Sequence, residues 1–392
     1  MSRAVDILLV GGGVAAASCS VELRSRGFDG SVLLVGRELD PPYERPPISK
    51  GLLLGSSSKE DAFVPVGEGV EVLTRTSVTK LDLEARVATL SSKEEVSFGR
   101  ALLATGANVR RLPIDGTELE GVHYLRALRN AATLREDVEG AERVALVGGS
   151  FIACEVAASL SKLGIASTLV FPEEEPLSLQ FGATAGRWVR SLLEEHGVEV
   201  LSGETVARLE GDGGDVARLV CSSGRVVACD AVVIGVGAVP DVMLARSSGF
   251  ELGAAGGVLC RSTLATVTSP DVFAAGDVCE YESPLHGRPV RIEHHEVAAA
   301  QGRCAARNLL GESEDFTEVP YFWSDLADWA TLESVGPAVD GWDAEEVLGS
   351  IDEGTFSVRY RKEGRLVACM TRGRPEDLDA ARAELAARAT AR

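Results

Sequence analysis

The sequence predicts an α/β protein with two Rossmann-like dinucleotide-binding domains, of the three-layer ββα type, and a C-terminal α+β domain. Apolar strands alternate with helical segments along most of the chain, which favours parallel sheets with helical crossovers. A strand, a glycine-rich turn and a helix follow one another twice, at Gly11 and at Gly148, and three of the four tryptophans lie beyond residue 316. We therefore expect three domains, formed by residues 1–111 with 234–316, by 112–233 and by 317–392.

The other elements follow from apolar periodicity and from the glycines that interrupt it. Strands are predicted, in chain order, over residues 5–10, 31–35, 70–76, 86–90, 101–107, 144–147, 168–171, 231–234, 272–275 and 356–361. Helices are predicted over residues 15–26, 125–138 and 293–310, and at the end of a strand–turn–helix unit over 144–163. Alternating polarity over 70–76 and 86–90 indicates small antiparallel strands.

Composition excludes several classes of partner. The 392 residues are 45% hydrophobic and 25% charged, which is typical of a globular protein. No run approaches the roughly 20 apolar residues of a membrane span, and no signal-peptide pattern opens the chain, so we expect a cytoplasmic location and no membrane partner. The formal charge of −20 argues against nucleic acid. The eight cysteines form no C-x-x-C pair, and we expect buried free thiols.

The first glycine-rich turn carries a complete dinucleotide-binding fingerprint, GGGVAA at residues 11–16. Gly11 would permit the tight turn, Gly13 the close approach of a pyrophosphate, and Ala16 the packing of the helix on the strand. Glu38 follows the next predicted strand, at the place where an acidic side chain accepts ribose hydroxyls. A first nucleotide is therefore predicted here.

Two later turns strengthen this assignment. Ala104, Thr105 and Gly106 end one buried strand, and Gly276 and Asp277 end another. Asp277 is predicted to begin a helix that points at the nucleotide and to hydrogen-bond the nucleotide through the adjoining turn. The alternative is that these turns are unrelated, but their combination with the fingerprint favours a single site.

The segment PYERPPISK at residues 42–50 resembles the P-Y-x-R-P-P-L-S-K motif of oxygenase-system ferredoxin and rubredoxin reductases and of apoptosis-inducing factor. These proteins form a branch of the FAD-dependent pyridine nucleotide oxidoreductase family, and the resemblance covers essentially the whole chain. It implies bound FAD, with Arg45 beside the pyrophosphate, Lys50 near flavin N5 and Val78 at the adenine. Prolines would stiffen a loop that holds two cations against an electron-accepting ring. The alternative is a surface loop with solvated cations.

Two further segments resemble the family around the flavin. Residues 291–298, which include Glu293, His294 and His295, are similar to the segment over the flavin pyrimidine, and Trp323 lies in a match to the F-W-S-D motif. The resemblance implies that these residues contact FAD. The two histidines could also bind a metal, although no Cys/His cluster supports that, or cap a helix, and Trp323 could be ordinary core.

The second glycine-rich turn is where the family binds a nicotinamide dinucleotide. The resemblance implies that Glu155 pairs with Lys50 beside N5, the alternative being an exposed glutamate on a helix. It also implies that two turns and the helix between them contact NADH, through Gly148, Ser150, Ile152, Glu155, Gly235 and Gly237.

Three departures weaken this second site. Ser150 replaces the second glycine, Ala153 replaces the third, and Phe171 falls where the family places a ribose-binding glutamate. Losing one charge-assisted hydrogen bond costs about 1.5–3 kcal/mol, roughly ten- to a hundredfold in affinity. The acidic run at 173–175 would repel a 2′-phosphate. We therefore expect NADH rather than NADPH, bound weakly.

The absence of a redox cysteine pair shapes the functional hypotheses. Related disulfide reductases carry two cysteines after the first unit, whereas this chain has none between Cys19 and Cys154. The leading hypothesis is a monomeric or homodimeric enzyme that passes hydride from NADH to flavin N5 and then electrons to a small iron–sulfur protein. The alternatives are an NADH oxidase or quinone reductase without a protein partner, and an FAD-binding scaffold with a degenerate nicotinamide site. A docking patch for a protein partner could be formed by Arg288, Arg291, Arg303 and Arg307.

Overall fold

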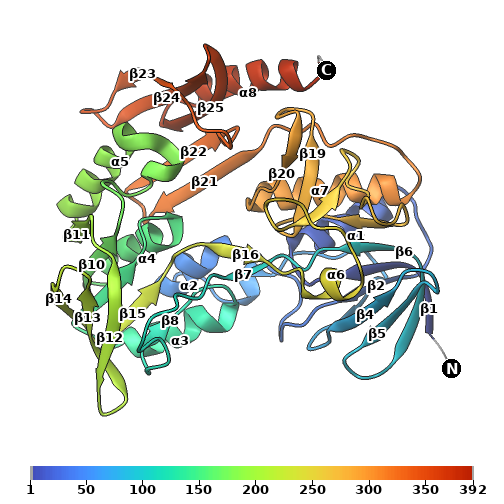
Figure 1. Cartoon of the computed structure of the whole chain (residues 1–392), viewed down its shortest axis with the longest axis horizontal. Coiled ribbons are helices and arrows are strands. Elements are labelled where there is room, and N and C mark those ends of the chain that lie inside the picture. The colour runs from blue at the N-terminus through green and yellow to red at the C-terminus, as the bar shows by residue number, and fades with distance from the viewer. Residues whose placement is uncertain (1–2, 391–392) are drawn as a thin grey trace.

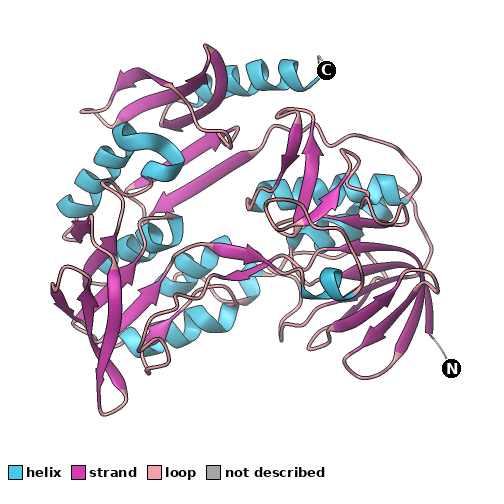
Figure 2. Cartoon of the chain, viewed as in Figure 1, coloured by secondary structure: helices cyan, strands magenta, loops and turns pink. Residues whose placement is uncertain are grey.

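The computed structural model describes residues 3–390 and has three parts in Figure 1. Blue segments from the N-terminal region and yellow to orange segments from later in the chain share the right-hand part, green segments form the left-hand part, and the red C-terminal sheet lies above it. Figure 2 shows how helices and strands alternate within these parts. The α-helices are α1 (Val14–Ser25), α2 (Gly51–Leu54), α3 (Leu128–Val138), α4 (Phe151–Lys162), α5 (Ser178–Glu195), α6 (Met243–Ser247), α7 (His295–Leu309) and α8 (Pro375–Thr390).

The right-hand part is built on a seven-stranded sheet. Its spatial order is β3 (Glu71–Leu73), β2 (Val32–Val35), β1 (Arg3–Val10), β6 (Glu95–Leu103), β5 (Val87–Leu90) and β4 (Val78–Asp82), and β18 (Val272–Ala274) also pairs with β6. β3, β2, β1, β6 and β18 are parallel, whereas β5 and β4 continue the sheet antiparallel. The chain therefore returns to its first sheet after it has formed the second.

The left-hand part repeats the parallel arrangement. Its sheet has the order β11 (Glu199–Ser202), β10 (Ala166–Phe171), β9 (Arg143–Val147), β15 (Ala231–Ile234) and β8 (Val122–His123). An antiparallel sheet belongs to the same part and consists of β12 (Val206–Asp212), β13 (Asp215–Cys221) and β14 (Val226–Ala228). The chain connects the right-hand and left-hand parts twice, and the two connecting segments pair with each other as the antiparallel strands β7 (Ala107–Val109) and β16 (Ala238–Pro240).

The remaining strands form two sheets. One consists of β17 (Val258–Cys260), β19 (Cys279–Ser283) and β20 (Arg288–Val290). The C-terminal sheet is antiparallel, in the order β21 (Tyr321–Leu326), β22 (Ala330–Val335), β25 (Arg365–Arg372), β24 (Thr355–Lys362) and β23 (Ala344–Ser350). Its strand β21 reaches down to α4 (Figure 1) and so links this sheet to the second Rossmann-like unit.

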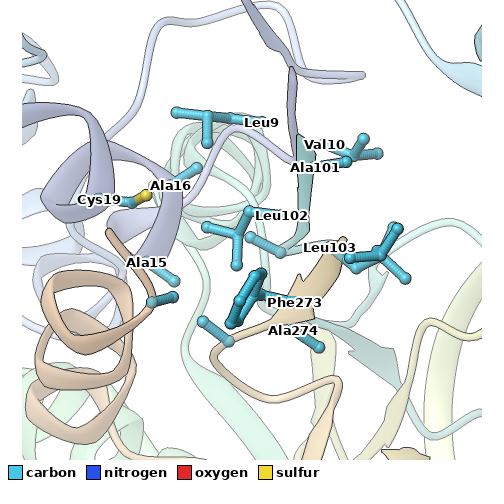
Figure 3. Packing of buried hydrophobic residues seen from close by; sticks show 14 of the residues in the cluster. Leu9, Val10, Ala15, Ala16, Cys19, Ala101, Leu102, Leu103, Phe273 and Ala274 are labelled. Atoms are coloured by element: carbon cyan, nitrogen blue, oxygen red, sulfur yellow. The ribbon is translucent and has the colours of Figure 1, made fainter. Parts of the chain in front are cut away.

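Small residues determine how closely the first unit packs. Figure 3 shows Leu9 of β1, Leu102 of β6 and Phe273 of β18 gathered beside the alanines of α1. α7 lies directly against α1, and a Cβ atom added at Gly302 would come within 2.2 Å of the Ala15 carbonyl oxygen. The alanine- and glycine-rich sequence of both helices is therefore what lets them meet.

The fold class is confirmed, and two local predictions are wrong. Within residues 70–76 only Glu71–Leu73 form a strand, the edge strand β3, which runs parallel to β2, because alternating polarity here reflects one solvated face rather than antiparallel pairing. Asp277 begins no helix: the Cys279 N–H donates to the Gly276 carbonyl over 2.8 Å and closes a turn that leads into β19. The eight cysteines are free and buried, as expected. The predicted domain boundaries stay a prediction, and their outermost residues, 1, 2, 391 and 392, lie outside the described range.

Candidate functional site

The first glycine-rich turn leaves backbone donors facing an open cavity. Gly11 has φ 131°, and a Cβ there would lie 2.0 Å from the Ala104 carbonyl oxygen, so only glycine permits this turn. Gly13 is the N-cap of α1, no side chain caps the helix, and its first turn holds no acidic residue. The uncapped N–H groups and the helix dipole together favour an anion such as a pyrophosphate.

A cavity of about 1680 Å³, its open mouth included, begins at this turn. It brings together most of the residues predicted for the first nucleotide, namely Gly11, Gly13, Glu38, Arg45, Lys50, Val78, Ala104, Thr105, Gly106, Gly276, Asp277, Glu293, His295 and Trp323. Ile152 and Glu155 from the second unit also line it. Ala16 and His294 do not: Ala16 is buried, and His294 is half-buried. The volume, the uncapped helix and the cations fit a dinucleotide.

An acid–base cluster lies at the wall of this cavity. Arg45 Nη2 is 2.6 Å from Glu38 Oε1, and Arg45 Nη1 is 2.9 Å from the Tyr43 hydroxyl, which itself donates to Glu38. Burial alone would raise the pKa of Glu38, but the charge of Arg45 and the Tyr43 hydroxyl outweigh it and hold that pKa below its usual value. Glu38 is therefore an ionised acceptor, and Arg45 is positioned by it.

Asp277 has a partner that the sequence did not point to. Arg126, in the loop before α3, places Nη2 at 2.7 Å from Asp277 Oδ2. The carbonyl of Arg126 also accepts from Arg45 Nη1 at 2.5 Å. Arg126 therefore ties the turn after β18 to the loop that carries Arg45, and no motif marks it.

The end of the cavity at Trp323 holds a buried ion pair. Lys50 Nζ is 2.7 Å from Glu155 Oε2 and 5.1 Å from the centre of the Trp323 ring. The Glu155 side chain is 4% exposed and that of Lys50 is 15% exposed. The alternative of an exposed helix glutamate is therefore wrong, because α4 directs Glu155 inward against β21 and the 42–50 loop.

Two serines donate hydrogen bonds to the carboxylate of this glutamate. Ser49 Oγ donates to Glu155 Oε2 over 2.5 Å, and Ser324 Oγ donates to Glu155 Oε1 over 2.6 Å. Neither serine was predicted, although each is the immediate neighbour of a predicted residue within a recognised motif, beside Lys50 and Trp323.

The two adjacent histidines have different environments. His294 is the N-cap of α7 but makes no side-chain capping bond, so the capping alternative is wrong for it. Its ring is enclosed beside Phe322, at 4.7 Å between ring centres, and burial lowers its pKa to about 4. His294 is therefore neutral at neutral pH, while His295 lines the cavity.

The second glycine-rich turn keeps the geometry of the first. Gly148 has φ 114°, and a Cβ there would lie 2.3 Å from the Gly235 carbonyl oxygen. Ser150 is the N-cap of α4 with φ −97°, close to the −102° of Gly13 at the start of α1. Its hydroxyl donates to the Gly235 carbonyl over 3.0 Å. The serine therefore fits the turn without backbone strain. The Gly148, Gly235 and Gly237 contacts to NADH stay a prediction.

The two units can be aligned by their backbone hydrogen bonds. The Gly11 N–H donates to the Val35 carbonyl over 2.8 Å, and the Gly148 N–H donates to the Val170 carbonyl over 2.9 Å. The residues after Val35 and Val170 therefore follow equivalent paths from the two parallel strands β2 and β10.

This alignment locates an acidic residue in the second unit. Arg75 N–H donates to the Glu38 carbonyl over 2.8 Å, and Gly203 N–H donates to the Glu173 carbonyl over 3.1 Å. Glu173 is thus the counterpart of Glu38. Phe171 precedes it by two residues and is a fully buried ring that packs against the Gly149 backbone. Sequence spacing alone does not reveal this offset.

A family model described as pyridine nucleotide-disulphide oxidoreductase matches residues 5–302. The chain belongs to this family. It is 32% identical to rhodocoxin reductase of Rhodococcus erythropolis, over 97% of this chain and 90% of that protein. It is 34% identical to the biphenyl dioxygenase system ferredoxin–NAD(+) reductase component of Paraburkholderia xenovorans, over 82% of this chain and 78% of that protein.

A solved structure agrees with these relatives. The covalent putidaredoxin reductase–putidaredoxin complex superposes with a TM-score of 0.92 at 28% identity, over 98% of this chain and 93% of that chain. The predicted family and enzyme class are thereby confirmed, as are FAD and a pyridine nucleotide as the cofactors. The residues assigned to each cofactor stay predictions.

The predicted docking patch of this oxidoreductase stays a prediction, and three of its four arginines are ion-paired. Arg288 pairs with Asp340, Arg291 with Glu293, and Arg307 with Glu314 and Glu22, and within residues 3–390 Arg303 alone of the four forms no ion pair. Over the same range, no group of three His, Cys, Asp or Glu side chains could hold a metal ion. None of the described helices is long and apolar enough to cross a membrane.

Proposed function

We propose that this oxidoreductase transfers electrons from NADH, through bound FAD, to a small iron–sulfur protein. The observation that carries the proposal is the buried Lys50–Glu155 pair at the end of the nucleotide cavity, where an internal cation faces the cavity and no cysteine pair accompanies it. Two relatives carry names that state ferredoxin–NAD(+) or rhodocoxin reduction, and the matching structure is a complex with putidaredoxin.

Within this proposal the residues of the chain bind and orient. Bound FAD supplies two-electron acceptance from a nicotinamide and single-electron release to an acceptor. Gly11 and the uncapped start of α1 receive the pyrophosphate, and Arg45, held by Glu38, adds positive charge beside it. Lys50 places an ammonium next to the ring that becomes more negative, and the Trp323 ring lies 5.1 Å from this ammonium. The cytoplasm is part of the proposal, because eight buried free thiols suit a reducing compartment.

The proposal names NADH because of Glu173. Its backbone position matches that of Glu38, and its partly exposed carboxylate is available for ribose hydroxyls. Glu175 is engaged by Arg190 Nε at 2.6 Å and is not available. A carboxylate at this point accepts a hydrogen bond from the 2′-hydroxyl of NADH and repels the 2′-phosphate of NADPH.

Glu173→Gln is expected to weaken NADH binding about tenfold, because one charge-assisted hydrogen bond becomes a neutral one. NADPH binding should weaken less or improve, since the repulsion of its 2′-phosphate falls. Calorimetric titration of the FAD-loaded variant with both nucleotides measures this. Glu174→Gln removes an exposed neighbouring charge and is the matched control. Equal NADH affinity in the wild type and in Glu173→Gln would remove Glu173 from the site.

Anaerobic mixing of the FAD-loaded protein with millimolar NADH is expected to bleach the flavin absorbance. A bacterial ferredoxin added to the reduced protein should then accelerate cytochrome c reduction, and salt should weaken that acceleration by screening the docked pair. Absence of bleaching contradicts the proposed function. An equal rate of cytochrome reduction with and without ferredoxin would instead favour a dioxygen or quinone acceptor. This acceptor is the second candidate because the arginines are ion-paired and the chain carries a charge of −20.

A further inference from the structure

Glu155 of α4 is held by side chains from two other parts of the chain. Its Oε1 atom accepts from Ser324 Oγ of β21 at 2.6 Å. Its Oε2 atom accepts from Ser49 Oγ at 2.5 Å and lies 2.7 Å from Lys50 Nζ, both in the 42–50 loop. The carboxylate itself comes from α4, so the first unit, the second unit and the C-terminal sheet meet at one group.

The two serine contacts are sheltered from water. Ser324 is 0% and Ser49 is 1% exposed, and Ser159 Oγ of α4 donates to the Ser49 carbonyl over 2.8 Å, which holds the Ser49 backbone in place. A buried carboxylate is stable only when its lone pairs are satisfied. With both oxygens engaged by fixed hydroxyls, the carboxylate plane has one orientation, and that orientation presents Oε2 to Lys50.

Strand geometry explains why Ser324 and Trp323 act on the same pair. Successive residues of β21 point to opposite faces, so Trp323 reaches the cavity and the Lys50 ammonium while Ser324 reaches the buried side of Glu155. The C-terminal sheet therefore contacts the ion pair from both ends.

We propose that Ser324 and Ser49 are positioning residues that fix Glu155 and thereby hold the Lys50 ammonium at the flavin end of the cavity. The inference rests on the proposed function, since it takes Lys50 to act on the bound flavin. Its consequence is that a serine on the C-terminal sheet contributes to the reduction potential of FAD without touching FAD. Releasing Oε1 would let the carboxylate rotate and draw Lys50 away from the ring.

The test compares Ser324→Ala with Ser324→Thr, which keeps the hydroxyl, and with Ser357→Ala. Ser357 is also fully buried in the C-terminal sheet, but it bonds Thr371 and Asp377 and does not line the cavity. Ser324→Ala is expected to make flavin reduction about tenfold less favourable, which is about 30 mV for two electrons. It should also slow reduction by saturating NADH three- to tenfold with unchanged NADH affinity. Ser324→Thr and Ser357→Ala should keep the wild-type potential.

Two further variants keep the outcome decisive. Ser49→Ala removes the hydrogen bond to Glu155 Oε2. It replaces Ser324→Ala in the test if that variant does not retain FAD, as judged by its absorbance and melting temperature. Lys50→Met reports on the proposed function itself. A wild-type potential in FAD-loaded Ser324→Ala and Ser49→Ala, together with a shifted potential in Lys50→Met, overturns the positioning role alone. An unshifted potential in Lys50→Met overturns the role of the ion pair in the proposed function.

Discussion

Lys50→Met is expected to slow the reduction of bound FAD by NADH about a hundredfold, because it removes the positive charge from the end of the cavity while keeping an apolar stem against Trp323. Removing one preorganised electrostatic group from an active site typically costs a factor of about 100–1000 in rate. Stopped-flow measurement of flavin bleaching at saturating NADH reports the rate constant directly. NADH affinity should change little, since Lys50 lies in the ion pair with Glu155 and not in the second glycine-rich turn.

The single variant also leaves a buried carboxylate without its cation, which destabilises a fold by about 3 kcal/mol. The double variant Lys50→Met with Glu155→Gln removes both charges and keeps acceptors and donors for Ser49 and Ser324. It should recover much of the lost stability and stay slow. A double variant that regains the wild-type rate would show that the defect came from the unpaired Glu155 and would contradict a direct role for Lys50.

The parts of the site that the sequence predicted are those in which a local pattern and a local structure coincide. Gly11 sits at the end of an apolar strand, and its left-handed backbone is what that motif encodes. The Lys50–Glu155 pair is different: it joins residues from distant parts of the chain, and only the family resemblance pointed to it. Ser49 and Ser324 stand beside predicted residues, yet no periodicity reveals which way a hydroxyl points.

What the sequence did not reveal depended on register or on three-dimensional neighbours. The family motif aligned Phe171 with a ribose-binding glutamate, and no sequence pattern pointed to Glu173, which the backbone bond from Gly203 identifies as the counterpart of Glu38. Counting arginines suggested a basic docking patch, but it could not show that acidic side chains such as Asp340 pair with three of the four arginines. A parallel edge strand and a turn at Asp277 were misread because local polarity does not specify a pairing partner.

Gly11→Ala is expected to destabilise the folded protein by about 4 kcal/mol and to abolish FAD binding. The new Cβ would lie 2.0 Å from the Ala104 carbonyl oxygen, and the backbone φ of 131° is one that alanine rarely adopts. Strained backbone costs about 1–3 kcal/mol and overpacking about 1–3 kcal/mol more, and β1 and β6 would have to separate to relieve the clash. Urea unfolding of the FAD-free protein, followed by FAD titration, measures both effects.

Gly13→Ala is the matched control for this prediction, because a Cβ at Gly13 meets no atom within 4 Å and the φ of −102° is open to any residue. The FAD-free variant should therefore unfold at the wild-type urea concentration. Its FAD affinity should nevertheless fall, since the added methyl group occupies the space beside the uncapped N–H groups where the pyrophosphate is expected. In the second unit, Ser150 stands at the position equivalent to Gly13, and its side chain does not disturb the turn. Equal loss of stability in Gly13→Ala and Gly11→Ala would contradict the assignment of a structural role to Gly11 and a ligand-facing role to Gly13.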